Sequence, residues 1–390
     1  MPEKKEKVLI VHNYYQIPGG EDTVIENEKN LLEANGHEVI LYTRHNSELK
    51  NMSKLEKLLL PLSIIFNVRT YWEVRNLIKS EKIDVLHVHN TLNLISPSVY
   101  YAAFSKRIPV VQTIHNFRLL CPGAAFYRNG HVCEECVSKS LLCAVKHKCY
   151  RGSMIQTLAC VISTSIHRML GTYGKLNYIC LTEFNKEKIL NLRQVKKENV
   201  FVKPNFVQAM PEGKINVQRK HQMVFAGRLD KLKGIDFLIR AWSKVKDVEL
   251  KLILCGTGPL EDWCKTYVAE HQLENIEIKG YVSNQDVKQL LGESEAMILP
   301  TQWYEGFPMT ILEAFSVGTP VLGSDLGNVG KLIVQNVNGR CFAPDEQEEL
   351  LDAVQSLNID YAKVFQYFKD HYSAESNYQI LKGIYEQVSK

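Results

Sequence analysis

Short runs rich in β-branched residues alternate with longer stretches of helical periodicity, and the alternation is repeated in the two halves of this chain. In the first half, the pattern predicts a helix at residues 24–33 and strands at residues 8–11, 39–42, 85–88 and 110–113. In the second half, it predicts strands at 223–226, 250–254, 276–278, 297–299 and 321–322, with helices at 235–245, 260–271, 285–291, 309–317 and 347–357. Such alternation is typical of parallel sheets covered by helices on both faces. The sequence therefore predicts an α/β fold with two such units.

The length of the chain agrees with two domains. It has 390 residues, of which 45% are hydrophobic, enough for two cores of ordinary size. A polar stretch follows Pro204-Asn205 and is typical of a linker. We therefore predict an N-terminal domain over residues 1–205 and a C-terminal domain over residues 206–390. Open parallel sheets bind ligands beyond the carboxyl ends of their strands, so the loops after the strands are expected to carry the chemistry.

The first residues are charged and lead directly into a strand-like run, which leaves no room for the apolar core of a signal peptide. No apolar run approaches the roughly 20 residues that cross a bilayer. A cytoplasmic protein is expected, and its ten cysteines are then expected to be thiols or metal ligands rather than disulfides.

Charge is distributed unevenly between the two halves. Residues 1–200 carry 27 Lys and Arg against 18 Asp and Glu, whereas residues 201–390 carry 20 against 25. A basic surface on the first domain suits an anionic partner, such as a phosphate-bearing ligand or an anionic membrane. The apolar residues 58–66 fit either a membrane interface or core packing, and they are surrounded by six basic residues: Lys50, Lys54, Lys57, Arg69, Arg75 and Lys79.

Two loops after predicted strands have residues suited to phosphate binding. Gly19-Gly20 precede a helix, where backbone N–H groups can approach a phosphate, although the pair also suits a plain turn and forms neither a G-x-G-x-x-G nor a Walker A motif. Arg228 and Lys233 stand five residues apart after the strand that ends near Ala226. They can clamp a diphosphate, and the alternative is a solvated basic turn.

The stretch from Thr301 to Phe315 is the most informative part of the sequence. Glu305 is expected on a loop after a strand, and Glu313 on the second turn of a helix that starts beside Pro308. Two carboxylates for hydroxyl groups and a helix N-terminus for an anion then meet at one site. A nucleotide sugar has both features, with its ribose, diphosphate and hexose.

Glu305-Gly306-Phe307-Pro308 followed by Glu313-Ala314 resembles the E-x7-E signature of the retaining glycosyltransferases of family 4. The fold of that family is GT-B, in which two Rossmann-like domains with parallel sheets face each other across a cleft. Other elements resemble the family in the same order along the chain: Gly19-Gly20, Pro204-Asn205, Ala226-Gly227-Arg228 with Lys233-Gly234, Gly256-Thr257-Gly258-Pro259, and Gly280-Tyr281-Val282.

The resemblance implies a role for each matching residue. Arg228 and Lys233 would bind the donor's diphosphate, and Glu313 would bind its ribose. Glu305 would contact the transferred sugar, with His115 beside it, although a lone histidine at a strand end is more often structural. The remaining donor contacts would come from Gly19, Gly20, Gly256, Gly258, Val282, Gly306, Phe307, Pro308, Met309 and Thr310.

The resemblance also implies a reaction. The acceptor would attack from the front face, and the departing diphosphate would act on the acceptor's proton, so that the configuration of the sugar is retained. The chain then needs charge stabilisation from Arg228 and Lys233 rather than a side-chain nucleophile. No Asp-x-Asp motif is present, and no catalytic metal is expected.

The function implied by the resemblance is transfer of a hexose from a nucleotide diphosphate sugar, with UDP favoured, to a saccharide acceptor. The acceptor would be lipid-linked and held by the N-terminal domain at an anionic membrane, in capsule or other surface polysaccharide biosynthesis, and nucleic acid is not an expected partner. Two alternatives stay open. One is a sugar-nucleotide epimerase of the same fold, and the other is a non-catalytic donor-binding subunit of a transferase.

A cysteine-rich insertion, at about residues 117–152, departs from the general pattern of the family. Cys133-Glu134-Glu135-Cys136 has the spacing of metal ligands, and Cys121 and Cys149 flank it. Four thiolates can close a tetrahedral structural zinc site. The alternative is a group of reduced, packed thiols.

Overall fold

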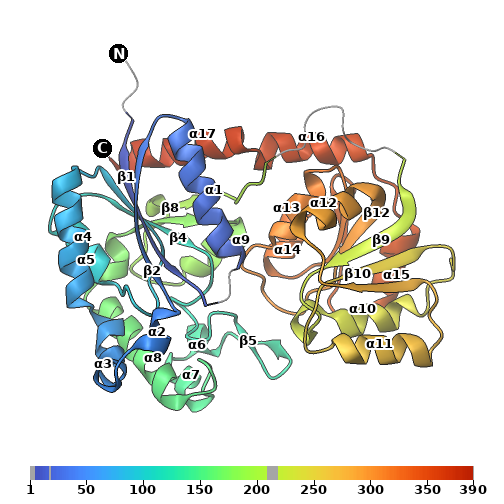
Figure 1. Cartoon of the computed structure of the whole chain (residues 1–390), viewed down its shortest axis with the longest axis horizontal. Coiled ribbons are helices and arrows are strands. Elements are labelled where there is room, and N and C mark those ends of the chain that lie inside the picture. Colours follow the sequence, from blue (N-terminus) through green and yellow to red (C-terminus); the bar gives the residue numbers. More distant parts are fainter. Residues whose placement is uncertain (1–4, 17–18, 209–217, 390) are drawn as a thin grey trace. The chain divides into compact units, whose positions relative to one another are not determined.

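The computed structural model describes residues 5–16, 19–208 and 218–389 (Figure 1). The chain divides into two compact units. Unit 1 comprises Met1–Arg128, Cys133–Pro204 and Asn377–Lys390, and unit 2 comprises Asn129–Val132 and Asn205–Ser376. Each unit contains a six-stranded sheet in which all the neighbouring strands are parallel. The predicted α/β fold with two parallel sheets is confirmed.

The sheet of unit 1 has the strand order β2-β1-β3-β4-β7-β8. Its strands are β1 (Lys7–Tyr14), β2 (Glu38–His45), β3 (Val85–Asn90), β4 (Val110–Ile114), β7 (Asn177–Cys180) and β8 (Val200–Val202). The central strands β3 and β4 are buried along their whole length, as expected of a parallel sheet with both faces covered. A two-stranded hairpin of β5 (Tyr127–Arg128) and β6 (His131–Val132) lies in the predicted insertion.

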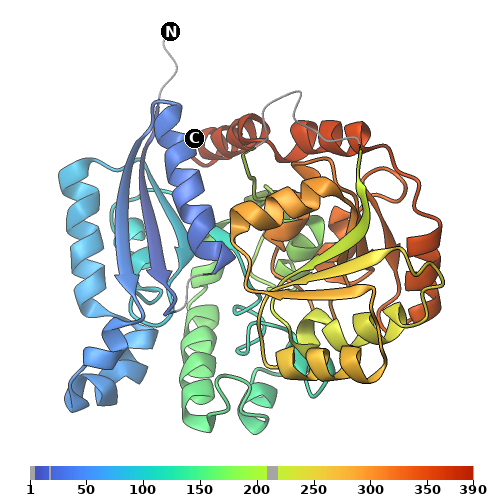
Figure 2. The ribbon, with the colours of Figure 1, turned by 45° about the vertical axis from the view of Figure 1, so that its right-hand side comes forward.

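The helices of the first part of the chain are α1 (Gly20–Ala34), α2 (Glu48–Asn51), α3 (Lys54–Ile65), α4 (Val68–Glu81), α5 (Ser98–Phe104), α6 (Glu135–Ser138), α7 (Leu142–Lys146), α8 (Met154–Met169) and α9 (Glu183–Ile189). Side-chain caps fix where several of them begin. The side chain of Ser53 accepts a hydrogen bond from the backbone N–H of Glu56, and Ser153 caps α8 in the same way. In Figures 1 and 2, α3 and α8 lie beyond the carboxyl ends of the strands of this sheet.

The helix at the end of the chain, α17 (Ala374–Val388), belongs mainly to unit 1. Its buried residues Leu381, Ile384 and Tyr385 share a hydrophobic cluster with Val8 of β1 and Ile25 of α1. The predicted single boundary, with all of residues 206–390 in the second domain, is therefore wrong for the last 14 residues. Their apolar face completes the core of the first unit.

The sheet of unit 2 has the strand order β11-β10-β9-β12-β13-β14. Its strands are β9 (Lys220–Ala226), β10 (Lys251–Cys255), β11 (Ile276–Gly280), β12 (Ser294–Leu299), β13 (Val321–Ser324) and β14 (Gly339–Phe342). Its helices are α10 (Ile235–Trp242), α11 (Glu261–Glu270), α12 (Asn284–Glu293), α13 (Met309–Phe315), α14 (Gly327–Leu332), α15 (Gln347–Gln355) and α16 (Tyr361–Tyr372).

Alternating residues of β9 divide the core of unit 2 into two layers. Met223 and Phe225 pack with α10 and α15, whereas Val224 and Ala226 pack with α12, α13 and α16. Figure 2 shows these two groups of helices on opposite faces of the sheet. Every strand and helix predicted in this half is present, with ends that differ by a few residues. None of the helices in the described ranges is long and apolar enough to cross a membrane.

Candidate active site

A pocket of about 320 Å³ opens in unit 2 at the carboxyl ends of its central strands. Loops after β9, β10 and β11 and the first turns of α12 and α13 form its walls. Many of the predicted donor-binding residues line it: Arg228, Gly256, Val282, Thr310 and Glu313. Its size falls in the range of small-molecule sites, about 300–1,000 Å³.

Two glycines allow the loops after β9 and β10 to pack backbone against backbone. A Cβ atom on Gly256, whose φ is +140°, would lie 1.8 Å from the carbonyl oxygen of Gly227. One on Gly258 would lie 2.4 Å from the carbonyl oxygen of Leu229. Hydrogen bonds join the same loops, because Leu229 N–H donates to the Thr257 carbonyl at 3.0 Å. Gly256 lines the pocket, while Gly258 holds its walls together.

The loop after β9 places its two cations differently. Arg228 is exposed, with 64% of its side chain accessible, and its Nε donates to the carboxylate of Asp230. Lys233 is more enclosed, and its Nζ lies 2.7 Å from Oε1 of Glu305. Asp230 also accepts a hydrogen bond from the backbone N–H of Lys233 at 3.0 Å, which fixes the turn between them. Arg228 borders the pocket, and the Lys233 stem passes beside Gly227 of its wall.

Glu305 is buried on the loop after β12, and one of its carboxylate oxygens has three partners. Oε1 accepts hydrogen bonds from Thr301 Oγ1 at 3.0 Å and Trp303 Nε1 at 3.0 Å, besides its contact with Lys233. The described part of the chain gives Oε2 no hydrogen-bond partner. Asn328 fixes the loop by donating to the carbonyl oxygens of Glu305 and Gly306. The carboxylate is thus held through one oxygen and has the other available.

Glu313 and the start of α13 complete the pocket. Burial raises the pKa of Glu313 above its usual value, and Lys288 partly opposes this shift. Phe307 and Met309 are partly buried against the core of unit 2, and Pro308 is the N-cap residue of α13. Of the predicted contacts in residues 305–313, only Thr310 and Glu313 line the pocket.

His115 lies in unit 1, after β4, and lines a smaller cavity of about 90 Å³. The cavity is also lined by residues of α3 and α8, including Ile64 and Ser163. Nε2 of His115 is 2.8 Å from Nδ1 of His89. Burial and the neighbouring His89 hold the pKa of His115 well below its usual value, so the ring is neutral at pH 7.

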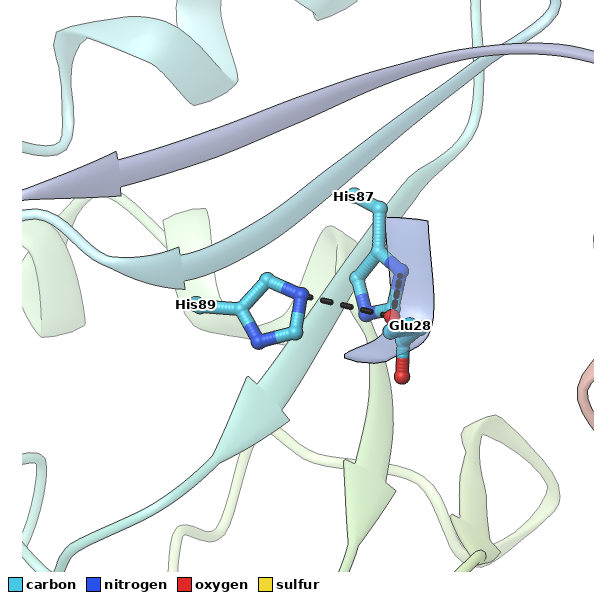
Figure 3. Close-up of side chains that lie close together, drawn as sticks. All are labelled: Glu28, His87 and His89. Atoms are coloured by element: carbon cyan, nitrogen blue, oxygen red, sulfur yellow. Dashed lines mark ion pairs between the residues drawn. The ribbon is translucent and has the colours of Figure 1, made fainter. Parts of the chain in front are cut away.

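A buried group of charged and polar side chains includes His89, the hydrogen-bond partner of His115. The sequence analysis did not predict this group. Figure 3 shows the carboxylate of Glu28 facing the rings of His87 and His89. Oε1 of Glu28 is 3.0 Å from Nδ1 of His87 and 3.4 Å from Nε2 of His89, and its Oε2 is 2.9 Å from Nζ of Lys203. The sequence does contain a signal for this group, because His87 and His89 occupy alternate positions of a buried strand in which apolar residues are expected.

Gly19 and Gly20 lie at the start of α1, in unit 1. Both are exposed, and the N–H of Gly19 donates to Oδ2 of Asp22 at 3.0 Å. That amide is therefore used within the helix cap. A role for these glycines in donor binding stays a prediction.

The four cysteines of the predicted zinc site lie near one another in unit 1. Burial, together with Cys121 and Cys149 nearby, raises the pKa of the Cys136 thiol to about 12. Among the described residues, only Glu28, His87 and His89 bring three ligand atoms within 4.8 Å of one another, so the cysteines do not form a closed ligand set. Zinc binding by Cys121, Cys133, Cys136 and Cys149 stays a prediction that metal analysis can check.

Comparisons with known proteins define the class. The family model described as "Glycosyltransferase Family 4" matches residues 18–132, and the one described as "Glycosyl transferases group 1" matches residues 209–369. With its two parallel-sheet units, the chain is a glycosyltransferase of the GT-B fold. It belongs to glycosyltransferase family 4.

Relatives and solved structures agree with this assignment. The chain is 29% identical over 220 residues to the uncharacterized glycosyltransferase MJ1607 of Methanocaldococcus jannaschii, a match that covers 51% of the chain and only 55% of that protein. It is 23% identical to an uncharacterized 41.2 kDa protein in the cps region of Klebsiella pneumoniae, over 90% of each chain.

Two solved structures share the fold over nearly the whole chain. The lipopolysaccharide outer core galactosyltransferase WaaB, in its apo form, superposes with a TM-score of 0.65 at 16% identity and covers 98% of this chain and 99% of its own. Anabaena Alr3699/HepE, solved in complex with UDP, gives a TM-score of 0.66 at 16% identity, with 98% and 100% covered.

Proposed function

We propose that this glycosyltransferase takes its sugar from a nucleotide diphosphate sugar, with UDP as the favoured nucleotide, and that unit 2 binds this donor. The proposal is carried by one observation: the exposed guanidinium of Arg228, loops that contain Gly227 and Gly256, and the carboxylate of Glu313 line the same pocket. HepE, which has the same fold, was solved with UDP and with UDP-glucose. The matching chemistry here is Arg228 for phosphate oxygens and Glu313 for ribose hydroxyls.

The transferred hexose is proposed to contact Glu305 of unit 2, and a contact of the sugar with His115 of unit 1 stays a prediction. The available Oε2 of Glu305 can accept a hydrogen bond from a sugar hydroxyl without losing the contacts that hold Oε1. The positive charges of Arg228 and Lys233 stabilise the diphosphate as it departs. We propose transfer with retention and without a catalytic metal, in which the acceptor attacks from the front face and the leaving diphosphate takes its proton.

A thermal-shift titration tests the donor site. UDP is expected to stabilise the folded chain, by about 2.7 kcal/mol at a concentration 100 times its Kd. Glu313→Gln should weaken this effect, since a neutral amide replaces the charged acceptor of two ribose hydroxyls. The matched control is Glu274→Gln on the exposed surface of unit 2. Equal UDP stabilisation of the two variants would contradict the assignment of the pocket.

Product analysis separates the proposed reaction from its alternatives. A transferase should release UDP from a UDP-sugar and form a glycoside when an acceptor is present. An epimerase would convert the donor sugar with no acceptor, and a donor-binding subunit would bind UDP but release nothing from the UDP-sugar. Either of these last results would replace the proposed function.

We further propose a lipid-linked acceptor, held by unit 1 at an anionic membrane. Four leucines on one face of α3 are exposed by 46% to 75%: Leu55, Leu58, Leu59 and Leu62. Their spacing of three and four residues is that of an interfacial helix, and exposed Lys54 and Lys57 accompany them. Because α3 and α8 also line the His115 cavity, an acceptor anchored beside these helices has a short path to that cavity.

The two arginines of the predicted surface have partners within α4. Nε of Arg69 is 2.7 Å from Glu73, and the Arg75 guanidinium lies over the ring of Trp72. We therefore assign membrane attraction to the lysines around α3. The cps-region relative and the likeness to a lipopolysaccharide galactosyltransferase support surface polysaccharide, such as capsule, as the product, made at the cytoplasmic side of the membrane.

Vesicle binding tests the membrane surface. Leu58→Glu with Leu62→Glu should weaken binding to vesicles rich in phosphatidylglycerol by at least tenfold, since burying one leucine contributes about 1.5–3 kcal/mol and 1.4 kcal/mol is about tenfold. Val248→Glu, at an equally exposed apolar site in unit 2, is the matched control. Binding that is unchanged by the leucine substitutions, or weakened equally by the control, would remove the membrane proposal.

A further inference from the structure

A continuous line of buried groups runs from Lys203 to the His115 cavity. Nζ of Lys203 is 2.9 Å from Glu28, Glu28 is 3.4 Å from Nε2 of His89, and Nδ1 of His89 is 2.8 Å from Nε2 of His115. The side chains of Lys203, Glu28 and His89 are at most 1% exposed, and the rings of His89 and His115 are stacked. Both His89 and His115 line this cavity. The two ring nitrogens of His89 face Glu28 and His115, whereas Nδ1 of His115 contacts no other member of the line.

The protonation state of each member follows from its surroundings. Burial alone would raise the pKa of Glu28, but Lys203 and His87 lower it well below its usual value, so the carboxylate is ionised. Burial and the adjacent His87 lower the pKa of His89 to about 4. His89 is neutral at pH 7, as is His115, whose ring also faces His12 and, farther away, Glu28 and Lys203.

A neutral imidazole carries one proton, and the line determines where it sits. The anionic oxygen of Glu28 beside Nε2 of His89 favours the proton on that nitrogen. Nδ1 of His89 is then an acceptor, so Nε2 of His115 must be the donor in their 2.8 Å hydrogen bond. Nδ1 of His115 is left without a proton, and the described residues give it no hydrogen-bond partner.

A metal ion is not needed to explain the cluster of Glu28, His87 and His89. The ammonium of Lys203 already supplies the positive charge beside the carboxylate. Both ring nitrogens of His87 also have hydroxyl partners, Tyr385 at 2.7 Å and Thr113 at 2.7 Å. The chain's own lysine therefore balances the charge of the carboxylate, while both oxygens of Glu28 and Nε2 of His89 are in ion-pair range but have no hydrogen-bond partner among the described residues.

We propose that Glu28 and His89 are positioning residues that fix the tautomer of His115, so that Nδ1 of His115 accepts a hydrogen bond from a hydroxyl group in the cavity. The identity of that hydroxyl, on the donor sugar or the acceptor saccharide, rests on the proposed function. The tautomer of His115 does not depend on the proposed function. A histidine with the opposite tautomer would present N–H and would select a carbonyl or carboxylate instead.

The tautomer can be read directly by nitrogen NMR of the full chain labelled with ¹⁵N-histidine. A spectrum of His115→Gln identifies the signals of His115 by their loss. The expected result is an unprotonated Nδ1 and a protonated Nε2 at pH 7, with no substrate present. A proton on Nδ1, or an even mixture of the two tautomers, would overturn the proposal whatever the enzyme's donor proves to be.

Two variants of His89 test the link to activity. His89→Phe keeps a ring but has no acceptor, so His115 should lose its fixed tautomer and kcat should fall about tenfold or more with little change in donor KM. His89→Gln can still donate and accept, and it should retain more of the activity and the wild-type His115 spectrum. An unchanged His115 spectrum in His89→Phe would contradict the positioning role, even if activity fell.

Discussion

Replacing Arg228 with alanine is expected to lower kcat/KM for sugar transfer by about 100-fold or more while leaving the stability of the fold nearly unchanged. A charged donor aimed at a departing anion typically contributes this much to catalysis. The Arg228 side chain is 64% exposed, and among the described residues it is paired with Asp230 on its own loop. The Asp230 carboxylate is 11% exposed and keeps its 3.0 Å hydrogen bond from the backbone N–H of Lys233, so the loss in stability should be small. Steady-state kinetics and thermal unfolding of the same preparation measure the two effects.

Lys233→Ala should differ from Arg228→Ala in its effect on stability. Glu305, 7% exposed in its side chain, would lose its cationic partner, and the free energy of unfolding should fall by about 1–3 kcal/mol in addition to the loss of activity. Lys244→Ala, at an exposed position in unit 2, is the control for both. Activity of Arg228→Ala equal to that of the control would remove Arg228 from the site.

Lys203→Ala is expected to have the largest effect on stability, a loss of about 3–5 kcal/mol in the free energy of unfolding. Lys203 and Glu28 are each 1% exposed, and removing the lysine leaves a buried carboxylate without its cation. Asn377 on α17 loses its 3.1 Å hydrogen bond to the same ammonium. Denaturant unfolding, monitored separately in each unit, measures the change.

The double variant Glu28→Gln with Lys203→Met provides the control, because it removes both charges together. It should recover much of the stability that Lys203→Ala loses. A loss of less than about 1 kcal/mol in Lys203→Ala would show that the ion pair is not what stabilises this part of the core.

Much of the fold could be predicted because buried parallel strands have a strong local signal. Val8–Val11 and Met297–Leu299 are apolar runs that are long enough to stand out. The edge strand β8 has only three residues, and β14 begins with Gly339 and Arg340, so neither differs clearly from a loop. The packing of α17 on unit 1 depends on contacts with residues more than 340 positions earlier, such as Val8, which no local pattern reveals.

The candidate site also has a part that the sequence could predict and a part that it could not. Motif order was enough to find Arg228, Gly256 and Glu313, because short loops at strand ends carry them to one pocket. It could not show that Lys233 is paired with Glu305, since side-chain packing between distant loops decides this. The contact of Glu28 with His89 was also out of reach, because it joins a helix to a strand some 60 residues later.

The return of α17 has a practical consequence for dividing the protein. Apart from the four residues Asn129–Val132, unit 2 is one segment of the chain, which passes between the units at Pro204–Asn205 and again at Ser376–Asn377. Residues of unit 1 precede and follow this segment in the sequence. A fragment cut after Pro204 would lack Tyr385 and Leu381 from its core and the partner of Lys203 at Asn377. Unit 1 can be produced separately only if the last helix is joined to it or supplied as a peptide. Residues 205–376 of unit 2, in contrast, can be expressed as one continuous segment.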